Sequence, residues 1–365
     1  MIKQEAFTED WINHKANELK NISKYIDPIL LEKVTKALYL IECLTKSKMS
    51  FIFKGGTAVI LLLKIARRFS IDIDIIVEKS VNIEQYLKSV IENNKVFNRF
   101  EKDERNKQVD LPVVHYKLFY YSIKDGKENY ILLDVLFEEN PYMEIIDTNL
   151  DCNLIDTVEP IIKINTPSID CILGDKLTAF APNTIGIPYG VDKELEIIKQ
   201  LYDISGLFDV CSNLNVVRET FIKVAQNQIN YRGLQNVTFI DVLNDIFETS
   251  MIITCRGTME PDKFKELDTG VRKMRGYSLE INSFIIEEAV KCAAKAAYLS
   301  MLLKCSKDRI ERFDSRIDLK GYFVNNKLVN SVKKYRPEGF YYWYKAIELR
   351  ESMEGMLEVA ATLGE

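Results

Sequence analysis

The sequence is poor in histidine and has no paired cysteine motif, and both absences exclude particular kinds of site. Only His14 and His115 occur among 365 residues, which argues against histidine-centred catalysis or metal binding. The seven cysteines are scattered and odd in number, without any Cys-x-x-Cys pair. Reduced thiols are therefore expected, and neither disulfides nor a zinc site.

The chain also lacks a long apolar segment, a secretory leader and a strong net charge. Its apolar run at residues 58–63 is stopped by Lys64. Acidic residues stand where a signal peptide carries basic and apolar ones: Glu5, Glu9 and Asp10. We therefore expect a cytoplasmic protein with no membrane partner. Lys and Arg total 49 against 54 Asp and Glu, a net charge of −5, so any nucleic acid would have to meet a local basic patch.

Composition and periodicity predict a folded chain of two domains. Hydrophobic residues make up 47% and charged residues 28% of the sequence, as in ordinary globular proteins. Strand and helix patterns alternate up to about residue 210, beyond which helical periodicity dominates. We expect an α+β domain over residues 1–210 and a helical bundle domain over residues 211–365.

A glycine pair near residue 55 has the pattern of a phosphate-binding turn. Residues 51–53 read as a strand, Gly55-Gly56-Thr57 as a tight turn, and the apolar run from Ala58 as a buried helix. Glycines let backbone N–H groups approach a phosphate, and a helix N-terminus favours negative charge. The P-loop pattern Gly-x-x-x-x-Gly-Lys-Ser/Thr is absent. A simple tight turn is the alternative.

Two acids follow in an alternating segment, Ile71 to Ile75. Asp72 and Asp74 are expected on one strand face and the isoleucines on the other. Carboxylates that close repel unless protons or a cation intervene, so the pair predicts Mg²⁺ or Mn²⁺. The alternative is a solvated sheet face that carries two ordinary acids.

A third acid lies inside an apolar strand. Residues 113–123 and 130–137 flank a turn at 124–127 and are expected to form a hairpin. Asp134 sits within the second of these strands, where a carboxylate needs a reason. It is the candidate that would complete a site for two metal ions about 4 Å apart, an arrangement suited to phosphoryl or nucleotidyl transfer.

Several segments between about residues 50 and 205 occur in the order found in one enzyme family. They are Phe53–Ala58, Arg68–Asp74, Asp134 in its strand, Asp175–Ala179 and Lys199–Ile204. The arrangement resembles the nucleotidyltransferases of the AbiEii/AbiGii toxin family, in the DNA polymerase β-like superfamily. The resemblance implies a nucleotidyltransferase-type mixed β-sheet flanked by helices, followed by the helical bundle domain.

The resemblance also implies roles for residues at matching positions. The residues that would be catalytic and hold metal are Asp72, Asp74 and Asp134. The residues that would contact or support the nucleotide are Gly55, Gly56, Thr57, Ser70, Arg68, Lys176, Lys199 and Asp203. The chain departs from the family at Ile71 and Gln200, where relatives usually carry acids, and it has no basic residue between Lys176 and Lys193.

For three of these positions a structural role is the alternative. Lys176 could be a solvated lysine or pair locally with Asp175. Asp203 could cap or pin its helix, and Arg68 could end a helix favourably through the helix dipole.

The implied activity is transfer of NMP from an NTP to an acceptor with release of pyrophosphate, dependent on Mg²⁺ or Mn²⁺. The resemblance implies a toxin of a toxin-antitoxin or phage-defence (antiviral) system, with a separate antitoxin protein as partner. The 3′ end of tRNA or another RNA is the implied acceptor. Two alternatives are a glycosyltransferase that uses Asp72-x-Asp74 to hold a nucleotide sugar, and a non-catalytic nucleotide- or partner-binding module.

A basic and aromatic segment near the C-terminal end offers an RNA contact. It comprises Val332–Arg336 and Phe340–Lys345, and basic residues interleaved with aromatics suit phosphate contact and base stacking. Burial of the aromatic run in the helical core is the competing interpretation.

Overall fold

The computed structural model describes residues 1–21, 23, 26–103 and 112–363. The chain forms two compact units, the first of Met1–Ser168 with Gly276–Ser283, and the second of Ile169–Arg275 with Phe284–Glu365. The division therefore falls earlier than the predicted boundary near residue 210. The reason is that the helices after Ser168 pack against later helices of the second unit.

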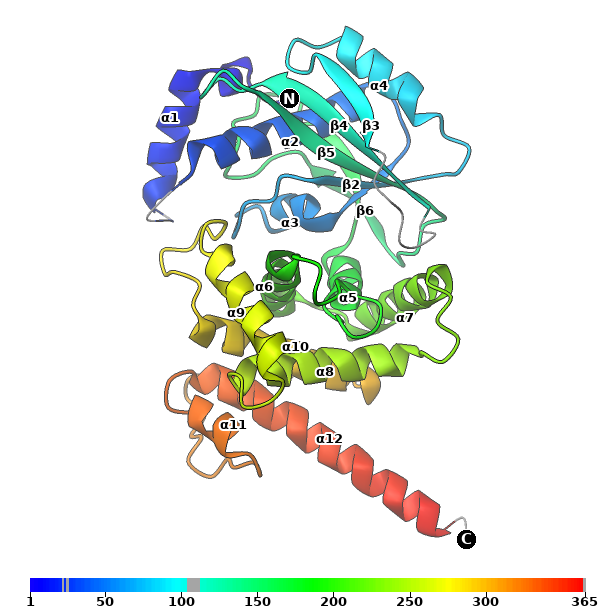
Figure 1. Cartoon of the computed structure of the whole chain (residues 1–365), viewed down its shortest axis with the longest axis vertical. Helices are drawn as coiled ribbons and strands as arrows, with labels where there is room; N and C mark the ends of the chain where they lie inside the picture. Colours follow the sequence, from blue (N-terminus) through cyan, green and yellow to red (C-terminus); the bar gives the residue numbers. More distant parts are fainter. Residues whose placement is uncertain (22, 24–25, 104–111, 364–365) are drawn as a thin grey trace. The chain divides into compact units, whose positions relative to one another are not determined.

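A mixed sheet forms the centre of the first unit. Among the described residues its strands are β1 (Ile52–Lys54), β2 (Ile73–Val77), β3 (Arg99–Asp103), β4 (Val113–Tyr121) and β5 (Glu128–Phe137). Their order across the sheet is β1-β2-β5-β4-β3 (Figure 1). β2 and β5 run parallel, and the other neighbours run antiparallel. The predicted hairpin is confirmed as β4 and β5.

The first unit also contains a smaller sheet and several helices. β6 (Ile145–Asn149) pairs antiparallel with β7 (Lys163–Pro167). The helices are η1 (Gln4–Phe7), α1 (Glu9–Glu18), η2 (Leu19–Asn21), α2 (Pro28–Lys46), α3 (Gly55–Leu63) and α4 (Ile83–Glu92). The predicted helix over 28–46 is confirmed: Asp27 caps α2 by accepting from the Ile29 and Leu30 N–H groups.

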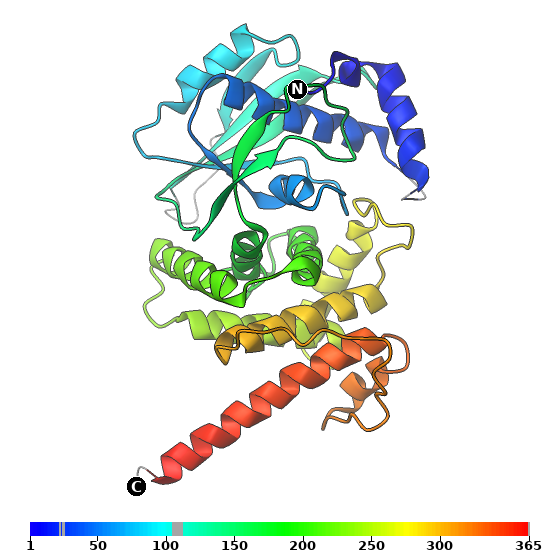
Figure 2. The same ribbon diagram turned by 180° about the vertical axis from the view of Figure 1, so that it is seen from behind.

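One face of the five-stranded sheet is apolar, and the other carries charged residues among apolar ones. Ile75 and Val135 are register partners on β2 and β5, and both belong to the core that includes Leu38 of α2 and Leu87 of α4. Helix α2 lies along the sheet in both views (Figures 1 and 2). Because side chains alternate along a strand, the neighbouring residues Asp74 and Asp134 belong to the opposite face.

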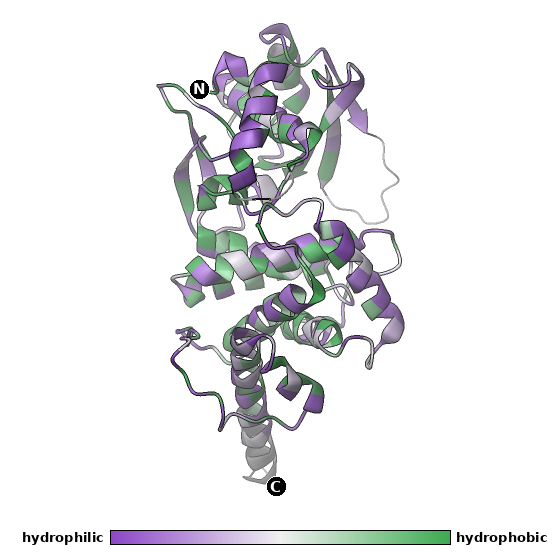
Figure 3. Cartoon of the chain, turned by 90° about the vertical axis from the view of Figure 1, so that its left-hand side faces the viewer, coloured by the Kyte–Doolittle hydropathy of each residue, from purple (hydrophilic) through white to green (hydrophobic). Residues whose placement is uncertain are grey.

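The second unit is helical. Its helices are α5 (Ile169–Ala179), α6 (Glu194–Val210), α7 (Leu214–Tyr231), α8 (Phe239–Thr254), α9 (Pro261–Met274), α10 (Ile286–Lys304), α11 (Lys327–Val332) and α12 (Pro337–Leu363). Hydrophobic and hydrophilic stretches alternate along them (Figure 3). Helix α10 packs against α6, α8 and α12. The predicted α+β class with a helical C-terminal region is confirmed.

The aromatic run of the C-terminal segment belongs to this core, so of the two interpretations the structure supports burial over base stacking. Phe340 and Trp343 are completely buried, and Trp343 Nε1 donates to Thr254 Oγ1 at 3.0 Å. Two of the neighbouring basic residues are engaged within the unit: Arg336 pairs with Glu288 at 2.7 Å, and Lys345 with Glu311 at 2.9 Å. Burial of these rings contributes to packing because aromatic side chains remove a large apolar area from water.

Two further expectations concern thiols and membranes. All seven cysteines, each within the described residues, are free thiols. None of the described helices is long and apolar enough to cross a bilayer.

A buried ion pair in the first unit provides a test of the fold. Lys36 and Glu32 lie one turn apart on α2 at 2.7 Å, with 4% and 2% of their side chains exposed. Burial lowers the pKa of Lys36, and Glu32 opposes that shift. Glu32 also accepts from Ser122 Oγ and the Ile123 N–H. The substitution Glu32→Gln should lower the free energy of unfolding by about 3–5 kcal/mol, because the ammonium would be left buried without a charge partner.

Urea unfolding followed by circular dichroism measures this loss. The matched control is Glu354→Gln in the exposed Arg350–Glu354 pair, which should change stability by less than about 1 kcal/mol. Equal stability of the two variants would contradict the buried-pair assignment.

Candidate active site

The glycine pair begins helix α3, and its first member lies against an acid of the next strand. Gly55 has φ of +78°, a conformation that side chains rarely adopt. A Cβ atom at Gly55 would lie 2.0 Å from Asp74 Oδ2. Only glycine at position 55 therefore allows the Asp74 carboxylate to lie against the backbone at the start of α3.

The second glycine is close to two polar side chains of the segment before β2. A Cβ atom at Gly56 would lie 2.5 Å from an Arg68 guanidinium nitrogen and 2.6 Å from Ser70 Oγ. Thr57 Oγ1 donates to the Asp72 carbonyl oxygen at 2.6 Å and lies 3.0 Å from Ser70 Oγ. The glycine turn and the acidic segment were predicted as separate motifs. In the structure they are in direct contact within the first unit.

Arg68 is held in the structure by backbone contacts. Its side chain is buried, and Nη1 donates to the Phe69 carbonyl oxygen at 2.9 Å. The Phe69 N–H donates to Tyr277 O, and the Leu279 N–H donates to Arg67 O, both at 2.8 Å. The segment Gly276–Ser283 is therefore joined to the chain immediately before the acids. Helix α3 ends at Leu63, so the alternative role for Arg68 at a helix terminus does not apply.

The acids occupy one row across the polar sheet face. Strand register pairs Lys54 with Asp74, Asp74 with Asp134, Asp134 with His115, and His115 with Asp103. Asp72 lies just before β2, two residues from Asp74. The structure thus places Asp74 and Asp134 side by side on neighbouring strands, which are only about 4.8 Å apart, and Asp72 lies two residues before Asp74.

The arrangement can accept a divalent cation only with some side-chain rotation. Asp74 and Asp134 are direct neighbours across β2 and β5, and carboxylate oxygens are the ligands that Mg²⁺ prefers. Within the described part of the chain, however, no three His, Cys, Asp or Glu side chains already surround one cation position. Because Asp134 is held by His115, a shared cation position would require the side chain of Asp72 or Asp74 to turn toward Asp134.

His115 is the residue of this row that the sequence did not single out. Its Nδ1 lies 2.6 Å from Asp134 Oδ1. The small number of histidines argues against histidine-centred catalysis or metal binding, but it does not say where His115 lies in the fold. The signal that could have brought it near Asp134 is the hairpin: symmetric pairing across the predicted turn at 124–127 places residue 115 opposite residue 136, and the observed register places it opposite residue 134.

The remaining predicted residues form a separate cluster in the second unit. Lys176 Nζ lies 3.1 Å from Asp203 Oδ2 and donates to Gln200 Oε1 at 2.9 Å. The side chains of Lys176 and Asp203 are 8% and 4% exposed. Lys199 pairs with Glu196 at 2.9 Å. Gln200 stands where relatives carry an acid, and its neutral amide satisfies the ammonium without adding a second negative charge.

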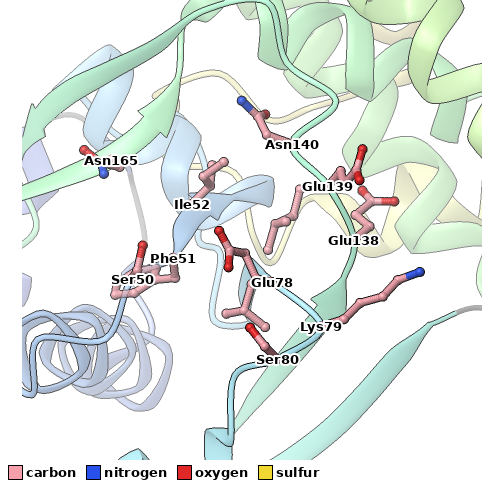
Figure 4. Close-up of a pocket in the computed structure, with 12 residues that line it drawn as sticks. Ser50, Phe51, Ile52, Glu78, Lys79, Ser80, Glu138, Glu139, Asn140 and Asn165 are labelled. Atoms are coloured by element: carbon pink, nitrogen blue, oxygen red, sulfur yellow. The ribbon is translucent and has the colours of Figure 1, made fainter.

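A cavity of about 580 Å³ lies elsewhere in the first unit, past the carboxyl ends of β2 and β5. Glu78, Glu138, Glu139 and Lys79 are among the residues that line it (Figure 4). The predicted acids lie toward the opposite end of β2, beyond this lining. Its lining includes neither the glycine turn nor any of the three predicted acids.

Comparison with known proteins identifies one family. The family described as "Nucleotidyl transferase AbiEii toxin, Type IV TA system" matches residues 39–280. No curated protein matches the chain in sequence.

Solved structures with a similar arrangement include three proteins of low identity. JHP933 from Helicobacter pylori is 17% identical, with 75% of this chain and 95% of that chain covered and a TM-score of 0.43. The nucleotidyltransferase toxin MenT4 from Mycobacterium tuberculosis is 11% identical, with coverages of 80% and 89% and a TM-score of 0.47. An antigenic nucleotidyltransferase-like protein from Paracoccidioides brasiliensis is 16% identical, with coverages of 55% and 89% and a TM-score of 0.36.

The glycine contact gives a prediction that separates steric from backbone effects. Gly55→Ala should reduce activity about 100-fold, because the new methyl group would displace Asp74 by about 1 Å or more. The matched control is Gly126→Ala in the turn between β4 and β5. Gly126 also has positive φ, at +68°, but a Cβ atom there would meet nothing within 4 Å.

Both variants carry a backbone strain of about 1 kcal/mol, and Gly55→Ala carries the steric clash with Asp74 in addition, so its thermal unfolding should shift by more than that of Gly126→Ala. Activity is measured as turnover of labelled nucleotide by each purified variant. Equal activity losses in the two variants would contradict a site built on the contact between Gly55 and Asp74.

Proposed function

The chain belongs to the AbiEii nucleotidyltransferase toxin family, and from this we propose that it transfers an NMP group from an NTP to an acceptor with the help of Mg²⁺ or Mn²⁺. Nucleotidyltransferase activity and the toxin class follow from membership. The metal requirement, the acceptor and the residue roles are our proposal.

The observation that carries the proposal is the opposition of two carboxylates beside a helix N-terminus. Asp74 and Asp134 are register partners, and Gly55 brings the first backbone of α3 against Asp74. Two neighbouring carboxylates favour a cation between them, and the leading N–H groups of a helix favour an anion. A metal–triphosphate complex contains both charges.

We assign each part of the site a task. Asp72, Asp74 and Asp134 would bind the cations through their oxygens. When bound, the cations would polarise the α-phosphate, lower the pKa of the acceptor hydroxyl and stabilise the leaving pyrophosphate. The N–H groups of Gly55 and Gly56 would donate to phosphate oxygens.

Polar side chains would keep these groups in place. The Thr57 hydroxyl donates to the Asp72 carbonyl, which supports a role in orienting the acids in addition to any phosphate contact of its N–H group. Arg68 and Ser70, packed beside Gly56, would support the turn. A glycosyltransferase that used only the Asp72-x-Asp74 pair would need no such contact between the glycines and the acidic segment.

We propose for Lys176, Lys199 and Asp203 the roles toward the nucleotide that the family resemblance implies. The ammonium of Lys176 would neutralise triphosphate charge, and Asp203 would hold that ammonium in place, as their 3.1 Å ion pair supports. Lys199, paired with Glu196, is proposed as a further basic group of the same motif.

The proposed cellular setting follows from the family. We propose a cytoplasmic toxin, in keeping with seven free thiols, that acts beside a separate antitoxin protein and could serve phage defence. RNA is the proposed acceptor, with the tRNA 3′ end as the first candidate. Because the aromatic run of the C-terminal segment is buried, recognition of RNA would depend on exposed basic groups and backbone, not on stacking by those rings.

The central test removes each acid in turn. Asp72→Asn, Asp74→Asn and Asp134→Asn should each reduce transfer of label from an α-labelled NTP to cellular RNA roughly a thousandfold, because each loses one anionic ligand. Chelation with EDTA should abolish the reaction in the wild type, and added Mn²⁺ should restore it.

The matched control is Asp147→Asn, which alters an exposed carboxylate on β6 of the same unit. It should keep wild-type activity. Label transfer that survived the three site substitutions in folded protein would refute the assignment, and label on protein instead of RNA would refute only the acceptor.

A separate prediction concerns the second unit. Lys176→Met should raise the KM for NTP more than it lowers kcat if the ammonium binds triphosphate in the ground state. Asp203→Asn should have a smaller effect in the same direction, since it frees the ammonium without removing it. Steady-state kinetics over a range of NTP concentrations measures both. An unchanged KM in the Lys176 variant would contradict the proposed contact.

A further inference from the structure

The polar row of the sheet contains a contact between an imidazole and a proposed metal ligand. His115 on β4 faces Asp134 on β5, with 2.6 Å between Nδ1 and Oδ1. About a quarter of each side chain is exposed, 23% for His115 and 25% for Asp134. The contact is therefore shielded, yet the carboxylate can still be reached by a ligand.

The direction of this hydrogen bond follows from the two groups. An ionised carboxylate can only accept, so His115 must carry hydrogen on Nδ1 and donate it to Oδ1. Hydrogen bonds to a charged acceptor are short and strong, and the 2.6 Å between Nδ1 and Oδ1 is a short separation. The bond selects one orientation of the Asp134 carboxylate out of those its side-chain torsions allow.

The position of Asp134 within the sheet explains why the orientation of its carboxylate matters. β5 lies between β2 and β4, so Asp134 has Asp74 on one side and His115 on the other. His115 holds Oδ1 from the β4 side, which would leave the second oxygen for a cation on the β2 side. We propose that His115 is a positioning residue that orients Asp134 toward the cation site it shares with Asp74.

This inference rests on the proposed function, because it requires Asp134 to be a metal ligand. Groups that hold the ligands of a metal are worth about 10–100-fold in metal affinity. His115 itself touches neither cation nor substrate in this account, and it acts only through Asp134.

The same strand supplies a matched control. Lys117 lies two residues from His115, on the same face of β4, and pairs with Asp103 at 3.3 Å. Loss of Lys117 changes a charge on this face of the sheet without removing the donor to Asp134. A long-range effect of charge or of strand stability would appear in a Lys117→Met variant, whereas the proposed hydrogen bond would not be affected.

The experiment measures Mn²⁺ binding directly. Electron paramagnetic resonance of free Mn²⁺ is followed during titration of wild type, His115→Leu, His115→Asn, Lys117→Met and Asp134→Asn, without nucleotide. We expect His115→Leu to weaken binding at least about 10-fold. His115→Asn, whose side-chain amide can place a donor near the position of Nδ1, should recover most of the loss, and Lys117→Met should bind as the wild type. Circular dichroism checks that each variant is folded.

The outcomes separate this inference from the function on which it rests. Unchanged affinity in His115→Leu, together with weakened binding in Asp134→Asn, would overturn the role of His115 and leave the metal site standing. Equal weakening in the folded Leu and Asn variants would also overturn it, because the donor would not be what matters. Wild-type protein that bound no Mn²⁺ would overturn both proposals.

Discussion

The electrostatic repulsion between Asp74 and Asp134 is the constraint around which the site is organised. Parallel pairing of β2 and β5 places their backbones side by side, and two ionised carboxylates at that spacing destabilise each other unless positive charge or hydrogen-bond donors are near. Lys54 and His115 occupy the next positions of the same row, one on either side of the acids. A divalent cation would complete this compensation, which is why the arrangement suits chemistry on a metal-bound polyphosphate.

A steric constraint on Asp74 explains why the start of α3 requires glycine. Asp74 is close enough to Gly55 that a methyl group would collide with its carboxylate, so the acid and the helix N-terminus occupy neighbouring positions. Thr57 then connects the helix to the Asp72 backbone. The backbone proposed to bind phosphate and the side chains proposed to bind cations are thereby in direct contact within one unit.

Much of this was predictable because its signals are local. The Asp27-Pro28 start of α2, the glycine turn and the β4–β5 hairpin each depend on short stretches of sequence, and Asp134 was conspicuous as an acid in an apolar strand. The pairing of β2 with β5 joins residues about 60 positions apart through no local pattern, and it was expected only because a metal site needs a third acid from a neighbouring strand. Packing of Gly276–Ser283 with the first unit is non-local for the same reason.

The aromatic run near Trp343 was ambiguous in sequence because exposed and buried rings have the same composition, and only packing decided it.

The central claim is that Asp72, Asp74 and Asp134 bind divalent cations together with a nucleoside triphosphate. The most direct measurement is anomalous X-ray scattering from a crystal containing Mn²⁺ and a non-hydrolysable NTP. The account predicts an anomalous peak within about 2.0–2.3 Å of oxygens from these three acids, with the triphosphate against Gly55 and Gly56. A bound triphosphate with its metal at any other position in the chain would contradict it.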